Sequence, residues 1–259
     1  MDQNVLNKLL AKLHLGSIRY FDSLGSTNDE ALARAASGAP DMSLIVADEQ
    51  TMGRGRYDRP WFTPPKTALA FSLILHPTLE ERPHLSRLVG MAALSIARAM
   101  QARNLYPEVK WPNDVLLNRR KVAGVLIELV WSGEDVENVV IGVGVNITKR
   151  SVPSTDILRF PAISMEDALG KPVDRAEVLY EILTQFISLR PQLGKDELIK
   201  QWEGLLAYQG RQVQVDMGGG QMVMGKVAGL EPDGSLNLRK EDGKLVTVRF
   251  GDVRLRPYA

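Results

Sequence analysis

The chain of 259 residues contains no cysteine. It therefore forms no disulfide and no thiolate metal site, and its own side chains cannot hold an acyl group as a thioester. Any acyl group that this protein moves must travel on another kind of carrier.

The chain also lacks an excess of charge and a long apolar run. Lys plus Arg number 32 against 31 Asp plus Glu, a balance that does not indicate a nucleic-acid or membrane surface. No apolar run approaches the about 18 residues of a membrane span, and Asp2, Lys8 and Lys12 in the N-terminal segment are wrong for a secretory signal. We predict a cytoplasmic protein with neither a membrane nor a DNA partner.

Apolar periodicity predicts an α+β fold with helices packed on a mixed β-sheet. Thr27-Asn28-Asp29-Glu30 has the pattern of a capping box at a helix start. A loop rich in Gly, Arg and Pro separates two buried strands and is the predicted mobile element. The predicted helices cover residues 5–13, 27–38, 85–100 and, as a pair, 174–206; the predicted strands cover residues 18–21, 43–47, 67–75, 109–111, 115–117, 122–131 and 139–147.

The pattern changes after Tyr208. Val213 and Val215 alternate with polar residues, and turn signals recur at Gly218-Gly219-Gly220, Pro232-Asp233-Gly234 and Glu241-Asp242-Gly243. Short strands at this spacing predict a small SH3-like β-barrel at the C-terminus. We therefore divide the chain into residues 1–207 and residues 208–259, and expect the two parts to share an interface because no long linker separates them.

Gly53-Arg54-Gly55-Arg56, extended by Arg59 and Trp61, combines glycines that let the backbone approach an anion with arginines that bind phosphate or carboxylate. Two other interpretations remain open, a solvated surface loop and an RNA contact. One short cluster in a neutral chain lacks the wider basic surface of an RNA-binding protein.

Lys110-Trp111-Pro112-Asn113-Asp114 and Lys121-Val122-Ala123-Gly124 form a second pattern. Asn113 and Asp114 offer oxygens suited to a magnesium ion that bridges phosphates, although Asn and Asp also favour turns. Lys121 follows a predicted hairpin tip and enters an apolar strand. It is either an exposed lysine or a charge directed at a ligand.

Ser26-Thr27-Asn28 is explained equally by helix capping and by a polar ligand at a helix N-terminus. Gly142-Val143-Gly144-Val145-Asn146 is a buried strand with small residues where a ligand approaches. No P-loop or dinucleotide fingerprint is present, and His14, His76 and His84 lack the spacing of metal ligands.

Read in order, these motifs together with Gln50 resemble those of the biotin protein ligases. The resemblance covers nearly the whole chain and implies a catalytic ligase domain in residues 1–207. It implies a two-step reaction in which biotin and ATP form biotinyl-5'-AMP, after which biotin passes to a lysine of a biotin carboxyl carrier protein. It also implies ATP with magnesium as substrate and ion, and a monomer or weak homodimer.

The resemblance further implies roles for individual residues. Lys121 and Arg56 are the expected catalytic residues, and Gly251, Asp252 and Arg254–Arg256 are expected on the ATP side. The expected biotin-binding residues are Ser26, Thr27, Asn28, Gln50, Gly53, Arg54, Gly55, Arg56, Lys121 and Gly124; the expected ATP-binding residues are Arg54, Arg56, Trp61, Lys110, Asn113 and Asn146; the expected magnesium ligands are Asp114 and Asn146.

The chain departs from the family's pattern in two places. Only a short segment precedes Ser26, whereas members that repress transcription carry a helix-turn-helix domain there, so we do not expect repression by direct DNA binding. Asp58 replaces a glycine that many members have in the arginine loop. The alternatives to a biotin ligase are a lipoate or octanoate attachment enzyme, which shares a lysine followed three positions later by glycine, and an RNA-binding regulatory module.

Overall fold

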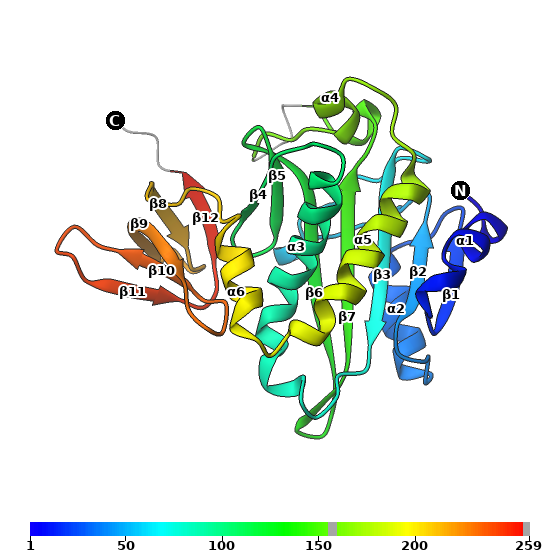
Figure 1. The fold of residues 1–259 in the computed structure, drawn as a ribbon, viewed down its shortest axis with the longest axis horizontal. Coiled ribbons are helices and arrows are strands. Elements are labelled where there is room, and N and C mark those ends of the chain that lie inside the picture. The colour runs from blue at the N-terminus through cyan, green and yellow to red at the C-terminus, as the bar shows by residue number, and fades with distance from the viewer. Residues whose placement is uncertain (155–159, 256–259) are drawn as a thin grey trace.

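The computed structural model describes residues 1–154 and 160–255. Within these ranges seven strands form one mixed sheet in the order β1-β2-β3-β7-β6-β5-β4 (Figure 1). The pair β1 and β2 is parallel, and the other neighbours are antiparallel. The strands are β1 (Ser17–Phe21), β2 (Ser43–Ala47), β3 (Ala68–Leu75), β4 (Pro107–Lys110), β5 (Asp114–Leu117), β6 (Arg120–Ser132) and β7 (Asp135–Asn146).

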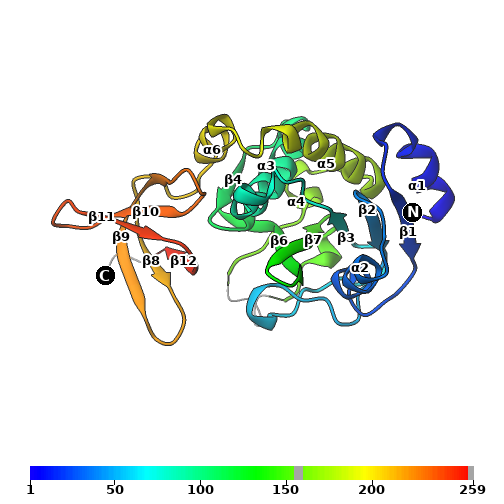
Figure 2. The same ribbon diagram turned by 90° about the horizontal axis from the view of Figure 1, so that it is seen from below.

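Helices cover both faces of this sheet, with α3 and α5 on one side and α2 on the other (Figure 2). Both faces need cover because successive residues of a strand point to opposite faces of the sheet. Phe71 and Ile141 belong to the large core with α3 and α5. Ile74 and Val140 point the other way and form a smaller cluster with Ala31 of α2. The helices are α1 (Gln3–Leu9), α2 (Thr27–Ala36), α3 (Leu88–Gln101), α4 (Met165–Leu169), α5 (Arg175–Leu189) and α6 (Asp196–Glu203). None of these is long and apolar enough to cross a membrane, as judged over the described ranges.

The C-terminal strands form a separate antiparallel sheet in the order β11-β10-β9-β8-β12. They are β8 (Gln212–Asp216), β9 (Met222–Leu230), β10 (Leu236–Arg239), β11 (Leu245–Val248) and β12 (Asp252–Leu255). Glycines with positive φ occupy the predicted turns, among them Gly218, Gly234 and Gly243. The predicted fold class, an α+β domain followed by a small β domain, is confirmed.

Two tryptophans join the two parts of the chain. Trp202 of α6 packs so closely on Gly90 of α3 and on Gly234 that a Cβ at either glycine would overlap the indole. Trp111 donates its indole N–H to the Gly234 carbonyl at 2.9 Å, and Ser86 Oγ donates to the Asp233 carbonyl at 2.9 Å. The expected shared interface is therefore present.

Three local predictions were wrong. The capping box at Thr27 does not form, because Ser26 is the N-cap and makes no side-chain capping bond, while Glu30 pairs with Arg34. The first predicted helix ends at Leu9 and continues as a 3-10 turn. Helix α4 was missed because five residues are too few to display a helical period.

Candidate active site

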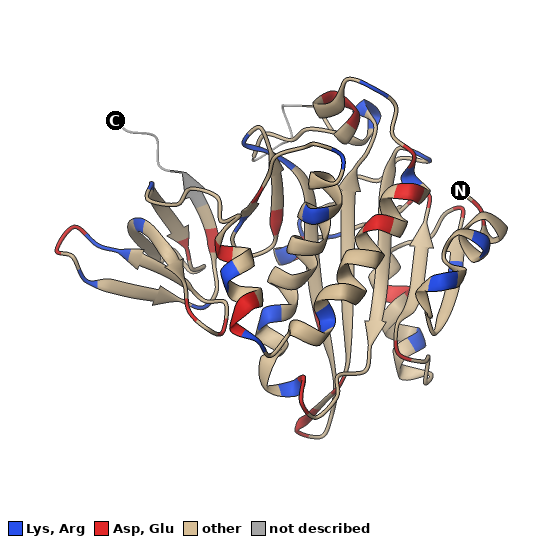
Figure 3. Ribbon diagram, in the orientation of Figure 1, with Lys and Arg blue, Asp and Glu red and all other residues tan. Residues whose placement is uncertain are grey.

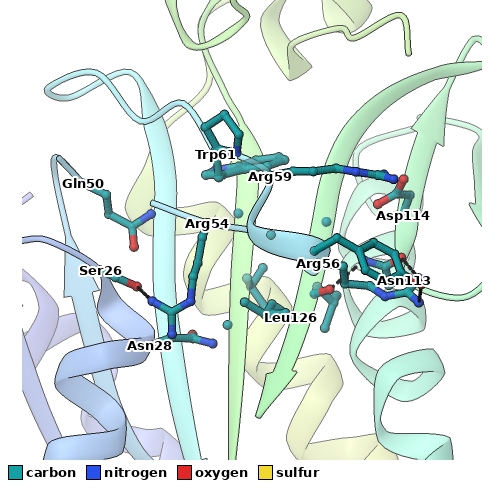
Figure 4. A pocket seen from close by; sticks show the side chains of 18 of the residues that line it. Ser26, Asn28, Gln50, Arg54, Arg56, Arg59, Trp61, Asn113, Asp114 and Leu126 are labelled. Carbon is teal, nitrogen blue, oxygen red and sulfur yellow. Dashed lines mark hydrogen bonds between the residues drawn. The ribbon is translucent and has the colours of Figure 1, made fainter. Parts of the chain in front are cut away.

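A hollow that is partly open to solvent lies on the α2 side of the sheet. Residues 124–126 of β6 and 142–144 of β7 form its floor. The residues around it come from the start of α2, the segment after β2, the arginine loop (residues 51–65), β5 and Asp252 of the C-terminal sheet (Figure 4).

Two floor glycines admit large side chains from above. A Cβ at Gly142 would overlap the Asn28 carboxamide, and a Cβ at Gly144 would overlap the Trp61 indole. The sequence predicted small residues here for the approach of a ligand. In the structure it is two protein side chains, each itself lining the hollow, that make this approach.

One end of the hollow is a polar recess. Gln50 Oε1 accepts from the backbone N–H and the hydroxyl of Thr27, at 2.8 and 3.0 Å. Ser72 Oγ, fully buried on β3, donates to Asn28 Oδ1 at 2.6 Å and lies 2.8 Å from Thr27 Oγ1. The free N–H of Thr27 at the helix start is therefore satisfied by Gln50 and not by a side-chain cap from Ser26.

The arginine loop folds back on itself as a narrow arch. Trp61 N–H donates to the Gly53 carbonyl at 2.8 Å, and Gly55 N–H donates to the Arg59 carbonyl at 2.8 Å. At its tip Tyr57 and Asp58 have φ of 58° and 53°. A left-handed residue explains why glycine suits position 58, and Asp tolerates that conformation better than most side chains.

The three loop arginines diverge. Arg54 pairs with Asp29 at 2.6 Å and Glu128 at 2.9 Å. Burial by itself would lower the pKa of Arg54, but the hydrogen bonds and charges of Glu128 and Asp29 raise it above its usual value. Arg56 instead donates to the Gly251 carbonyl at 3.0 Å and to Asn113 Oδ1 at 3.4 Å.

The other end of the hollow gathers charge from both sheets. Lys121 Nζ lies 2.7 Å from Asp114 Oδ1 and 5.3 Å from the centre of the Trp61 ring. Lys110 Nζ lies 3.6 Å from Asp114 Oδ2 and 3.3 Å from Asp252 Oδ1, and Asp252 also pairs with Arg59 at 2.6 Å. Lys121 is therefore held across the hollow, between the polar recess and the C-terminal sheet.

Gly124 faces Lys121, because a Cβ there would lie 3.1 Å from the lysine Cε and Nζ. That distance is shorter than most real side-chain contacts. Lys121 and Gly124, three positions apart on the same strand β6, are thus neighbours in which the glycine leaves room for the lysine side chain.

The residues do not fit a magnesium site held by protein ligands. Both oxygens of Asp114 face lysines. Asn146 donates to the Ile163 carbonyl at 3.3 Å and lies on β7, with β6 between it and Asp114. Over residues 1–154 and 160–255 no group of three or more His, Asp or Glu could hold a metal ion. The assignment of magnesium to Asp114 and Asn146 stays a prediction that the geometry does not favour.

Most of the predicted site residues line the hollow, while Gly53, Lys110 and Asn146 do not. Gly53 lies behind Gln50 and Trp61, and Lys110 is buried beside Asp252. Of the expected C-terminal residues, Gly251 and Asp252 reach the loop; the side chains of Arg254–Arg256 lie outside the described part of the chain.

Glu128, Asp29 and Ser72 were not predicted as site residues from the sequence. Glu128 bonds both Arg54 and Asn28, Asp29 pairs with Arg54, and Ser72 joins Thr27 to Asn28. Glu128 and Ser72 had a visible signal, since each is the polar residue of an otherwise apolar strand core. Asp29 had none, because an acidic residue in the first turn of a helix is ordinary.

Two family models match the chain. The model of the biotin/lipoate A/B protein ligase family matches residues 20–146, and that of the biotin protein ligase C terminal domain matches residues 208–256. The match therefore includes every strand of the large sheet except the first residues of β1, and nearly all of the small one.

Known relatives agree with these models. The biotin--[acetyl-CoA-carboxylase] ligase of Mycobacterium tuberculosis is 32% identical over 241 residues, covering 88% of this chain and 85% of that protein. The bifunctional ligase/repressor BirA of Bacillus spizizenii is 33% identical over 241 residues, covering 91% of this chain and 73% of that protein. The biotin protein ligase of Aquifex aeolicus in complex with biotin and ATP superposes with a TM-score of 0.80 at 28% identity, covering 93% of this chain and 99% of that one. The chain belongs to the biotin protein ligase family.

The two alternative functions receive less support. The lipoate or octanoate alternative does not account for the match to a biotin protein ligase C-terminal domain. For the RNA-binding alternative, Arg54 and Arg59 already pair with carboxylates, and charges of both signs are interspersed over the described ribbon (Figure 3).

Proposed function

We infer that this protein is an ATP-dependent ligase that joins biotin to a lysine of a biotin carboxyl carrier protein. In the first step a carboxylate oxygen of biotin attacks the α-phosphorus of ATP, and pyrophosphate leaves. In the second step the neutral amine of the carrier lysine attacks the acyl carbon of biotinyl-5'-AMP, AMP leaves, and the amine loses a proton. Without cysteine the chain offers no thioester route, in agreement with an adenylate carrier.

The observation that carries this proposal is a single hollow with two unlike ends and Lys121 between them. The recess of Thr27, Asn28 and Gln50 offers fixed donors and acceptors suited to the ureido ring of biotin. The opposite end offers Arg56 and Lys121 to the carboxylate and the phosphates. Two anions must meet there, and preplaced positive charge lowers the free energy of that encounter.

We assign to Asp114 the role of positioning Lys121 before the substrates bind. Its Oδ1 lies 2.7 Å from Lys121 Nζ, so the lysine is kept extended until an incoming anion competes for it. Magnesium enters as the ion that accompanies ATP, and its charge is supplied through the phosphates.

The Trp61 indole is assigned to the nucleotide. Its ring lines the hollow beside Lys121, and its buried Nε1 has no hydrogen-bond partner among the described residues.

Purified protein, ATP, labelled biotin and a purified biotin carboxyl carrier domain provide the test. We expect pyrophosphate release and biotin on the carrier, and no transfer when the carrier's target lysine is replaced by arginine. A parallel reaction with octanoate or lipoate separates the two acyl classes. Transfer of octanoate without transfer of biotin would refute the proposal.

A further inference from the structure

Two carboxylates, Asp29 and Glu128, surround the single positive charge of Arg54. Its Nη1 lies 2.6 Å from Asp29 Oδ1 and donates to Ser26 Oγ at 3.4 Å, and its Nη2 donates to both oxygens of Glu128 at 2.9 and 3.1 Å. These partners come from the start of α2 and from β6. Figure 4 shows Arg54 directed at Ser26 and Asn28, whereas Arg56 lies beside Asn113.

This pairing makes Arg54 a poor site for a substrate anion. An incoming carboxylate or phosphate would have to displace a carboxylate and would be repelled by the one left behind. Arg56 differs, because its guanidinium bonds an amide oxygen of Asn113, the hydroxyl of Tyr57 and the Gly251 carbonyl, and none of these is a carboxylate. A phosphate can replace neutral acceptors with a gain in charge pairing.

Glu128 joins Arg54 to the polar recess. Its Oε2 accepts from Asn28 Nδ2 at 2.6 Å, while Asn28 Oδ1 accepts from Ser72. Both ends of the carboxamide are therefore used, and its orientation above Gly142 is fixed. A continuous series of polar contacts leads from Gln50 through Thr27, Ser72 and Asn28 to Glu128.

We propose that Arg54, Glu128 and Asp29 form a clamp that positions the arginine loop, and that Glu128 is its central member. The clamp holds the first leg of the loop on α2 and β6 and sets the Asn28 carboxamide, so that Arg56 meets the substrate anions and Arg54 does not. Arg54 and Glu128 are positioning residues for biotin binding. The catalytic part of this inference depends on the proposed function, whereas the clamp itself does not.

Hydrogen exchange in the ligand-free protein tests the clamp without reference to activity. Glu128→Gln leaves one acceptor oxygen in place of two, so the side chain can no longer accept from Asn28 and Arg54 through separate oxygens. The backbone amides of residues 51–61 should then exchange about tenfold faster than in the wild type. Glu137→Gln makes the same charge change at an exposed position of β7 and should exchange like the wild type. Unchanged protection of residues 51–61 in Glu128→Gln would overturn the clamp.

Steady-state kinetics test which arginine meets the anions. Arg54→Gln and Glu128→Gln should each raise the KM for biotin by about tenfold to a hundredfold with a much smaller change in kcat, and the double variant should be no worse than the poorer single one. Arg56→Gln should instead lower kcat for transfer of biotin to the carrier protein. Circular dichroism checks folding, and Glu128→Asp, which keeps the charge, should be intermediate.

Two outcomes would separate failure of the clamp from failure of the proposed function. If Arg54→Gln lowers kcat as Arg56→Gln does while Glu128→Gln leaves both constants unchanged, Arg54 contacts the reacting anions and the clamp is wrong. If the wild type transfers no biotin, the proposed function fails, and the exchange experiment still decides on the clamp.

Discussion

Lys121 shows how one residue acquires a role from its neighbours. Its ammonium lies between the Asp114 carboxylate and the Trp61 ring, and Gly124 leaves the space it occupies. An ordinary lysine after a hairpin tip would be exposed to solvent, as the sequence allowed. Here the strand register of β5 and β6 turns it into the hollow.

Replacement of Lys121 by alanine should leave the protein folded and lower the rate of biotinyl-5'-AMP formation by about 10² to 10³ fold, the usual effect of removing one preplaced charge. Pyrophosphate release with biotin and ATP is the measurement. Lys12→Ala, at an exposed position, is the matched control and should be unaffected. Equal pyrophosphate release from the two variants would contradict the role assigned to Lys121.

Gly142→Ala should weaken biotin binding and destabilise the fold together. The new methyl group would overlap the Asn28 carboxamide on the hollow's floor, and overpacking of this kind lowers the free energy of unfolding by about 1–3 kcal/mol. Chemical denaturation and biotin titration measure the two effects. Gly204→Ala meets only ordinary contacts and has a helical φ, so it should show neither.

At the scale of elements, the arginine loop connects the two parts of the chain. Its first leg is bonded to α2 and β6 through Arg54, and its tip reaches β12 through Arg59. The loop was predicted to be mobile without ligand, and that prediction remains to be tested. We expect residues 51–65 to gain protection from hydrogen exchange when biotin and ATP are added, because an anion supplies Arg56 with a charged partner. Equal protection with and without both substrates would refute it.

The Arg56→Gly variant should still form biotinyl-5'-AMP but release it into solution. The substitution removes donors worth about 1.5–3 kcal/mol and loosens the backbone, so the adenylate should escape roughly ten to a hundred times more readily. The mixed anhydride then reacts with amines of unrelated proteins. The measurement is biotin attached to albumin after incubation with biotin and ATP.

Wild-type protein is the control for that experiment. If albumin carries no more attached biotin with Arg56→Gly than with the wild type, while adenylate forms normally, Arg56 does not retain the intermediate. Arg59→Gly is a useful comparison, because Arg59 pairs with Asp252 and its loss should disturb the C-terminal contact first.

At the scale of the whole molecule, Asp252 links the two sheets. It accepts from Arg59 at 2.6 Å and from Lys110 at 3.3 Å. Burial alone would raise the pKa of Asp252, but Lys110 and Arg59 hold that pKa below its ordinary value. A carboxylate with a lowered pKa stabilises the fold above its unfolded pKa of about 3.9 and ceases to do so as pH falls through the lower folded value.

The stabilising effect of Asp252 should therefore be complete at neutral pH and decline below about pH 4. Chemical denaturation at a series of pH values measures it: wild type should exceed Asp252→Asn in stability at pH 7, with the difference shrinking in acid. Glu134→Gln, at an exposed turn position, is the control. A difference that is constant from pH 7 to pH 3 would show that the charge of Asp252 is not what links the sheets.

The sequence by itself determined the elements and the chemistry. Nearly continuous apolar runs place β3 and β7 inside a sheet, because a strand that is covered on both faces buries successive side chains on either side, and the glycines after Tyr208 mark turns because they adopt positive φ. The arginine and lysine motifs are local, so they were visible without a fold. The lengths of α1 and α4 could not be predicted from the sequence, because the stability of a short helix depends on what it packs against.

Only the tertiary structure decided which charges meet. Glu128 lies 100 residues from Asn28 along the chain, and Asp252 lies 193 residues from Arg59, so no spacing in the sequence relates them. Strand alternation puts Glu128 on the same face of β6 as Gly124 and Leu126, where it meets Asn28 and Arg54, and the docking of the C-terminal sheet brings Asp252 to the loop. Arg54 and Arg56 look equivalent in Gly-Arg-Gly-Arg. They differ because two carboxylates from α2 and β6 surround the first, while Asn113, Tyr57 and a backbone carbonyl receive the second.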